Sequence, residues 1–136
     1  MVTATKPPPL DAQSAHEGFN VFKSECPARL VLDHLGDKWA LLILHRLRAE
    51  PARFNALRRD INGVSQKVLS QVLKRLERDG LLTRSVFATV PVTVEYALTP
   101  LGETLTVTVG ELLHWAEANM PSIRAAQAAY DARQAA

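Results

Sequence analysis

The sequence predicts a mainly α-helical α+β fold in which one β-hairpin interrupts a series of amphipathic helices. Apolar residues recur at helical spacing over most of residues 27–79, whereas residues 82–98 alternate between apolar and polar side chains. With 136 residues, of which 47% are hydrophobic, the chain can bury one core but is too short for two independent globular domains.

The amino-terminal residues lack an apolar period and contain a Lys-Pro-Pro-Pro run. We therefore expect residues 1–19 to form a disordered or loosely attached arm and residues 20–136 to form one domain. The first expected helix starts at Pro27, since proline suits a position where no backbone N–H is needed. It ends near Gly36, after about two turns.

Asp37 is expected to cap a second helix, Lys38–Arg48. Its apolar positions surround most of the circumference, which is typical of a helix at the centre of a small core. Pro51 separates it from a short third helix over residues 54–61, and the Asn62-Gly63 pair is a turn signal that ends this third helix.

The fourth expected helix has the clearest signal in the chain. Ser65 is a good N-cap, a narrow apolar stripe runs from Val68 to Leu76, and Gly80 closes the helix after Asp79. Seven side chains with hydrogen-bond donors face away from the stripe: Gln66, Lys67, Ser70, Gln71, Lys74, Arg75 and Arg78.

Residues 82–88 and 92–98 change to a period of two and predict a hairpin. Thr99-Pro100 then starts a long helix. Residues 104–109 are largely β-branched and alone would favour a strand, but the helical stripe continues on both sides of them. We expect Pro121 to end this helix, and a last alanine-rich helix to reach about residue 133.

Charge is distributed unevenly along the chain. Residues 46–84 contain ten Lys or Arg and four acidic residues, a local charge of +6, whereas the remainder of the chain sums to −4. Solvated helix faces would explain a scatter of charges, but they explain this segregation less readily. A local basic patch of this kind is typical of a nucleic-acid-binding surface.

The second, third and fourth expected helices, followed by the hairpin, predict a winged helix-turn-helix. The third and fourth helices form the helix-turn-helix pair, and the hairpin is the wing. The first helix and the carboxy-terminal helices are then extra elements for dimerisation. The donors of the fourth helix would then enter the major groove of DNA, where glutamine suits adenine and lysine suits guanine. The free N–H groups beside Ser65 favour a phosphate. Arg53, Arg84 and Thr93 complete the predicted DNA-binding set; an ordinary solvated surface is the alternative for all these residues.

Six stretches in order resemble one family, the HxlR-type regulators, a winged-helix group related to the MarR regulators. They are Cys26-Pro-Ala-Arg-Leu, Gly36-Asp-Lys-Trp-Ala-Leu-Leu-Ile-Leu, Arg53-Phe-Asn-Ala-Leu-Arg, Gly63-Val-Ser-Gln-Lys-Val-Leu, Leu76-Glu-Arg-Asp-Gly-Leu and Val94-Glu-Tyr-Ala-Leu-Thr-Pro-Leu-Gly. Gln66 stands where a proline is common in the family, and Thr93 stands where the wing often carries an arginine. Both departures leave the operator sequence open.

The resemblance implies a homodimer that binds double-stranded DNA at a palindromic operator. The first and the carboxy-terminal helices would form the dimer, with Leu30, Leu105, Leu112 and Trp115 at the interface. A repressor is the expected role, although the residues themselves do not separate repression from activation.

Cys26 is the one cysteine of the chain, and it precedes a proline at the expected start of the first helix. The proline biases Cys26 to extended geometry and to the N-cap position, where the free N–H groups and the helix dipole favour a thiolate. In several members of the resembled family a cysteine at this position senses oxidants, quinones or aldehydes. The alternative is a small buried residue at a dimer contact. With one thiol per subunit, oxidation could give only an intersubunit disulfide, a mixed disulfide or an adduct.

Other classes of function have less support. The sequence has no glycine-rich phosphate loop, no zinc-protease motif and no serine elbow, so we expect no enzyme and no cofactor. One cysteine and four scattered histidines predict no metal site. No apolar run approaches the length of a membrane span and no secretory signal is present, so we expect a cytoplasmic protein without membrane contact.

Two alternatives within the same fold stay open. The regulator could respond to a non-covalent small-molecule ligand, bound between the dimer helices near Trp39 and Trp115. The winged helix could also bind another protein without binding DNA, because fold alone does not fix function.

Overall fold

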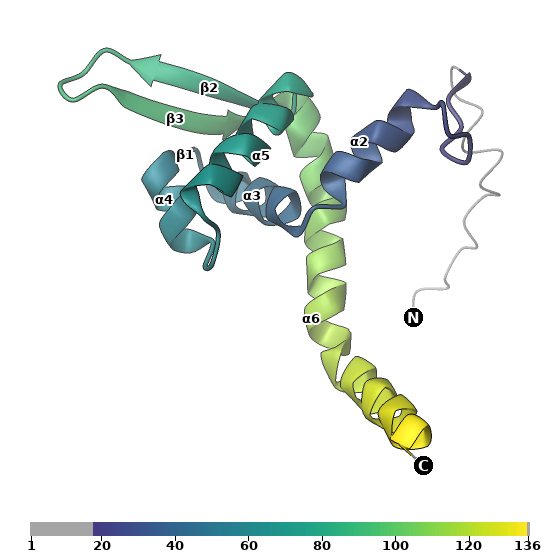
Figure 1. Ribbon diagram of the computed structural model, residues 1–136. Coiled ribbons are helices and arrows are strands. Elements are labelled where there is room, and N and C mark those ends of the chain that lie inside the picture. The colour runs from purple at the N-terminus through teal and green to yellow at the C-terminus, as the bar shows by residue number, and fades with distance from the viewer. Residues whose placement is uncertain (1–17, 136) are drawn as a thin grey trace, which may run out of the picture.

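The computed structural model describes residues 18–135, so most of the predicted arm, residues 1–19, lies outside the described residues. The elements, labelled as in Figure 1, are α2 (Pro27–Leu35), α3 (Lys38–Ala49), β1 (Ala52–Arg53), α4 (Phe54–Asp60), α5 (Gln66–Arg78), β2 (Leu82–Phe87), β3 (Thr93–Leu98) and α6 (Pro100–Ala135). The predicted fold class, mainly helical with a β-hairpin, is confirmed.

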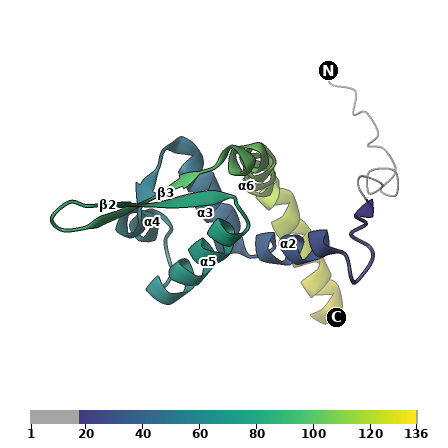
Figure 2. The same ribbon diagram turned by 90° about the horizontal axis from the view of Figure 1, so that it is seen from above.

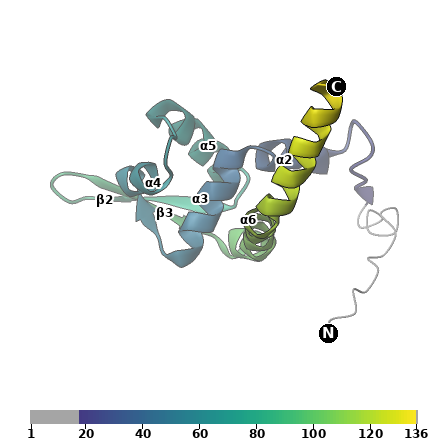
Figure 3. The same ribbon diagram turned by 90° about the horizontal axis from the view of Figure 1, so that it is seen from below.

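Helix α3 is the centre of the core, as its apolar circumference predicts. Figure 3 shows it between α6 and the pair formed by α4 and α5. Asp37 caps its start, because the Asp37 Oδ1 atom accepts a hydrogen bond of 2.9 Å from the backbone N–H of Trp39. The residues buried on α3 and α5 are Ala40, Ile43, Leu44, Leu47, Leu69, Val72, Leu73 and Leu76.

The sheet has three antiparallel strands in the order β1-β3-β2. Strands β2 and β3 form the predicted hairpin, with Leu82 opposite Leu98, although each strand is one residue shorter than expected. Tyr96 of β3 is buried against the core. No sequence pattern predicts β1, a two-residue strand whose Ala52 lies opposite Tyr96.

Helix α6 corrects the prediction that Pro121 ends the helix, because it continues unbroken from Pro100 to Ala135. Proline removes one helical hydrogen bond and crowds the preceding turn, which kinks a helix when favourable residues flank it on both sides. Figure 1 shows α6 changing direction where its colour passes from green to yellow. The alanine-rich segment after Pro121 is therefore the last part of α6.

The β-branched residues of α6 are helical, as the apolar stripe predicts. The hydroxyls of Thr104 and Thr106 donate to the carbonyls of Leu101 and Glu103, at 2.6 and 2.8 Å. A threonine that bonds the preceding turn in this way satisfies its hydroxyl within the helix. Local β preference therefore yields to the helical packing of α6.

The hairpin and α2 leave the head of the molecule on opposite sides. Figure 2 shows this arrangement from above, and Figure 1 shows α6 continuing well beyond the other elements. The protomer thus consists of a packed head, formed by α3–α5 and the sheet, and two helices, α2 and α6, that project from it.

Candidate nucleic-acid interface

One face of α5 carries exposed polar and basic side chains, and its opposite face is buried in the core. Ser65 caps the helix as predicted: its Oγ accepts a hydrogen bond of 3.1 Å from the N–H of Val68. Five of the predicted contact residues are exposed on α5: Gln66, Lys67, Gln71, Lys74 and Arg78. Helical spacing therefore presents a row of donors to the outside while the apolar stripe holds α5 in place.

A shallow hollow separates this face of α5 from the hairpin. Gln66, Ser70 and Lys74, at intervals of four residues, line it from the helix, and Arg84 lines it from β2. Its floor is apolar, formed by Phe54, Val94 and Tyr96. The fold thus brings together residues of α5 and of the hairpin that are 10 to 30 positions apart in the sequence.

The exposed cations of this face keep their charge available to a partner. Within residues 18–135, no ion pair involves Lys67, Lys74, Arg78 or Arg84. Arg53, the N-cap of α4, is also exposed and lies opposite Glu95 in the β1–β3 register. Uncompensated lysine and arginine side chains on one surface are what phosphate binding requires.

Arg75 and Thr93 are placed differently from the other predicted residues. Arg75 is half-buried, and its Nη2 donates a hydrogen bond of 3.1 Å to Oδ2 of Asp37, so its guanidinium turns toward the start of α3. Thr93 is also half-buried, with its hydroxyl 3.2 Å from that of Thr89 in the hairpin turn. Neither side chain belongs to the exposed row on α5.

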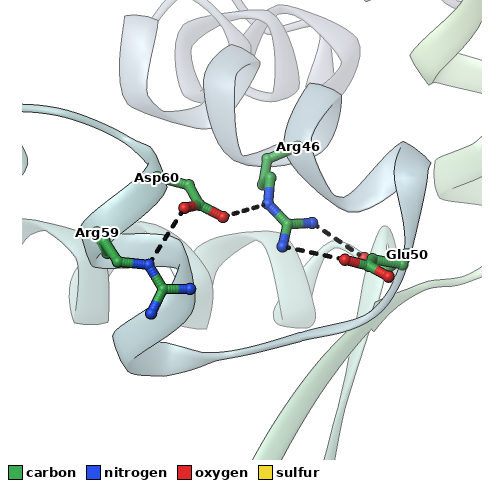
Figure 4. A network of polar contacts seen from close by, with 4 residues as sticks. All are labelled: Arg46, Glu50, Arg59 and Asp60. Carbon is green, nitrogen blue, oxygen red and sulfur yellow. Dashed lines mark hydrogen bonds and ion pairs between the residues drawn. The ribbon is translucent and has the colours of Figure 1, made fainter.

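A polar network joins the end of α4 to α3 (Figure 4). Arg46 Nε donates a hydrogen bond of 2.8 Å to Asp60, and its Nη2 lies 3.7 Å from the carboxylate of Glu50. The Nε of Arg59 lies 3.5 Å from the other oxygen of Asp60. The hydrogen bond from Arg46, with the charges of both arginines, lowers the pKa of Asp60 below its ordinary value of 3.8, although desolvation opposes this shift.

Cys26 lies at the N-cap of α2 in extended geometry, as predicted, and is 7% exposed. Among the predicted interface residues, Leu30 of α2 and Leu112 and Trp115 of α6 are each at least half exposed. Leu105 is half-buried in an apolar groove between α2 and the start of α6. The protomer therefore leaves apolar side chains of both projecting helices uncovered.

Sequence reasoning missed two partners of α5. His34, one of the four histidines for which we expect no metal-binding role, has its Nδ1 2.9 Å from Oδ2 of Asp79. Asp37 was identified only as a helix cap, yet its second oxygen holds Arg75. Both contacts join positions about 40 residues apart, which a local sequence pattern cannot indicate.

Residues 18–135 contain no group of three His, Cys, Asp or Glu side chains that could hold a metal ion. In the same part of the chain, no helix combines the length and the apolar character that a membrane span requires.

Comparison with known proteins agrees with this geometry. A family model described as HxlR-like helix-turn-helix matches residues 34–124. The chain is 47% identical to YtfH of Escherichia coli, named as an uncharacterized HTH-type transcriptional regulator, over 84% of this chain and 90% of YtfH.

Two solved structures extend the comparison. The first is ytfH from Salmonella typhimurium, named as a putative transcriptional regulator, at 46% identity and a TM-score of 0.76, covering 80% of this chain and 97% of that one. The second is the redox regulator HypR in its reduced form, at 34% identity and a TM-score of 0.67, covering 73% of this chain and 98% of HypR. Family and relatives are regulators and not enzymes, and the chain belongs to the HxlR-like helix-turn-helix family of DNA-binding transcriptional regulators.

Proposed function

We propose that this regulator is a homodimeric repressor that binds a palindromic operator through the exposed face of α5. The hollow between α5 and β2 is the main support, because Gln66, Ser70 and Lys74 share it with Arg84. A row of donors on α5 beside Arg84 of the hairpin matches the requirement of a recognition helix for base edges in the groove and phosphates at its rim.

The proposed contacts divide by chemistry. Gln66, Ser70 and Gln71 read base edges, and Lys67 reaches either guanine or a phosphate from the first turn of α5. Lys74 and Arg78 contact the backbone farther along the helix. Ser65 orients the free N–H groups of the first turn toward a phosphate. The side chains placed beside the DNA groove that α5 enters are Arg53, Arg84 and Thr93.

The proposed dimer uses the uncovered apolar side chains of α2 and α6. Leu30, Leu112 and Trp115 are each at least half exposed in the protomer, which is costly for large apolar groups in water. Leu105 lines the groove between these helices and would be covered at the same time. Two recognition helices related by the dimer axis then meet half-sites about one DNA turn, roughly 34–36 Å, apart.

Cys26 is the proposed point of control, where an oxidant, a quinone or an aldehyde acts. Similarity to the redox regulator HypR supports this role. In the oxidative form of the proposal, two Cys26 thiols of one dimer lose two protons and two electrons to the oxidant and join as an intersubunit disulfide. The 7% exposure of Cys26 favours the competing role of a packed residue, and the response to oxidants distinguishes the two roles.

Selection of DNA fragments from the genome of the source organism tests the proposal. The full-length chain is incubated with sheared genomic DNA at about physiological salt, and the retained fragments are sequenced. A shared inverted repeat in the retained fragments is the expected result. The matched control is the double variant Lys67→Ala, Lys74→Ala, which should retain far less of the same fragments. Retention without a shared sequence would overturn operator recognition, whereas equal retention by the double variant would overturn the assigned face.

A further inference from the structure

Two polar contacts join the carboxy-terminal half of α5 to the corner between α2 and α3. Nδ1 of His34 lies 2.9 Å from Oδ2 of Asp79, where an ionised carboxylate accepts from the Nδ1–H tautomer, and Nη2 of Arg75 donates to Oδ2 of Asp37 at 3.1 Å. The side chains of His34 and Asp79 are only 18% and 12% exposed, so little water competes for their contact. Hydrogen bonds to charged groups in such surroundings are stronger than those at an open surface.

The same end of α5 is also tied to the start of α6. Beyond the C-cap at Asp79, the N–H of Gly80 donates to the carbonyl of Glu77, and that of Leu81 donates to the carbonyl of Leu76. Gly80 adopts a φ of 77°, which a residue with a side chain rarely does. The hydroxyl of Thr99, just before α6, then donates to the carbonyl of Gly80 at 2.6 Å.

These contacts all lie at the carboxy-terminal end of α5, and this position matters for the proposed dimer. Each of the two projecting helices that carry the uncovered apolar residues reaches α5 at its carboxy-terminal end. The amino-terminal half of α5, with Gln66 and Lys67, is the part offered to DNA in the proposed function. The carboxy-terminal end of α5 is therefore held by contacts to the projecting helices, and its amino-terminal end contacts the DNA bases in the proposed function.

We infer that His34, Asp37, Arg75 and Asp79 form a strut that sets the angle between α5 and the projecting helix α2. This inference rests on the proposed dimeric DNA binding and deepens it. Within it Arg75 is a positioning residue and not a phosphate contact, because Nη2 is held by Asp37 and Nε is buried without a hydrogen-bond partner among the described residues.

Simple geometry shows what the strut controls. Helix α5 has 13 residues and is therefore about 20 Å long at 1.5 Å per residue. A pivot of about 10° at its fixed end moves the reading end by about 3.4 Å, the rise of one base pair. Loss of the strut should therefore alter the half-site spacing that the dimer accepts, beyond any effect on folding.

The test uses full-length protein and a set of duplexes in which the selected half-sites are moved one base pair closer together or farther apart. His34→Ala and Arg75→Met each remove one strut contact, and His34→Asn restores an N–H donor near the position of Nδ1. Asp60→Asn is the matched control, since it removes two ion pairs of the head that lie outside the strut. Affinity, its salt dependence and urea stability are measured for each protein.

Wild type, Asp60→Asn and His34→Asn should lose on the order of tenfold in affinity when the spacing changes, which is the scale of one lost specific contact. His34→Ala and Arg75→Met should bind the shifted duplexes within about threefold of the original, a free-energy difference of less than 1 kcal/mol. The salt dependence of Arg75→Met should equal that of wild type.

Two results would overturn the strut. One is that His34→Ala and Arg75→Met show the same dependence of affinity on half-site spacing as wild type, while losing about as much stability as Asp60→Asn. The other is a fall of about 0.9 in the salt slope of Arg75→Met, the value for one lost phosphate contact.

Failure of wild type to bind any duplex would instead overturn the proposed function. Amide hydrogen exchange then tests whether the strut holds the end of α5. His34→Ala should lower the exchange protection of residues 74–78 more than Asp60→Asn does. Equal protection in the two variants would remove the strut as well.

Discussion

Arg46 Nε of α3 donates a hydrogen bond of 2.8 Å to Oδ2 of Asp60 at the end of α4. This contact fixes the first helix of the helix-turn-helix pair, α4, to the central helix of the core. It also stabilises the ionised form of Asp60, whose pKa lies below 3.8 in the folded chain. Because both side chains reach the surface, the contribution is modest and weakens at high salt.

Acid should therefore weaken the attachment of α4. The folded-state pKa of Asp60 is lowered, so its contribution to stability is fully present above the unfolded-state pKa near 3.8 and is lost as pH falls through the lower folded value. Urea unfolding of wild type and Asp60→Asn at a series of pH values measures this. The stability difference between the two proteins should be largest at neutral pH and should shrink below about pH 4. A pH-independent difference would contradict the assignment.

The Ser65 cap should contribute to both folding and DNA binding, and the two effects can be separated. Ser65→Ala removes the hydrogen bond to the N–H of Val68 and should lower the free energy of unfolding by about 1 kcal/mol. Ser65→Asp keeps a cap but places a negative charge where a phosphate is proposed. It should fold with near wild-type stability and bind operator DNA much more weakly. Wild-type affinity in Ser65→Asp would show that this helix end does not face the backbone.

The proposed dimer predicts that charge on α6 breaks the assembly. Leu112→Asp should convert the dimer to a folded monomer in sedimentation velocity, since burying an unpaired carboxylate is strongly unfavourable. Val90→Asp on the hairpin turn is the matched control, because Val90 is even more exposed than Leu112 yet lies outside both projecting helices. A dimer that persists in Leu112→Asp would place the interface elsewhere.

The two roles of Cys26 give different responses to oxidants. Operator affinity of wild type and Cys26→Ser is compared before and after treatment with diamide or a quinone. If Cys26 is the sensor, treatment changes the affinity of wild type by tenfold or more, about 1.4 kcal/mol, and leaves Cys26→Ser unaffected. Identical responses of the two proteins would assign Cys26 a packing role and leave the regulator itself intact.

Elements with a strong local signal were predictable from sequence. Ser65, the apolar stripe and Gly80 define α5 almost to the residue, because capping and amphipathic spacing are encoded within one segment. The hairpin is equally predictable, because apolar and polar side chains alternate along both of its strands. Strand β1 has only two residues and exists through pairing with β3, so no local pattern could predict it.

The candidate site was predictable only in part. The exposed donors of α5 follow from the stripe that they oppose, since both depend on the same helical period. The placement of Arg75 does not, because it depends on Asp37, 38 positions away in the sequence. The prediction at Pro121 was wrong for a different reason. A local rule for ending helices failed there, because the helix-favouring residues on both sides continue α6 past the proline.

The salt dependence of operator binding is the most direct test of whether the exposed face of α5 binds DNA. The logarithm of the association constant of wild type is measured against the logarithm of salt concentration, and the measurement is repeated with the Lys67→Ala, Lys74→Ala double variant. We expect a steep negative slope for wild type. At about 0.9 per lost phosphate contact, the slope of the double variant should be smaller in magnitude by about 0.9 if Lys67 binds guanine and by about 1.8 if Lys67 binds a phosphate. Equal slopes and affinities for the two proteins would contradict the assignment of this face of α5 to DNA.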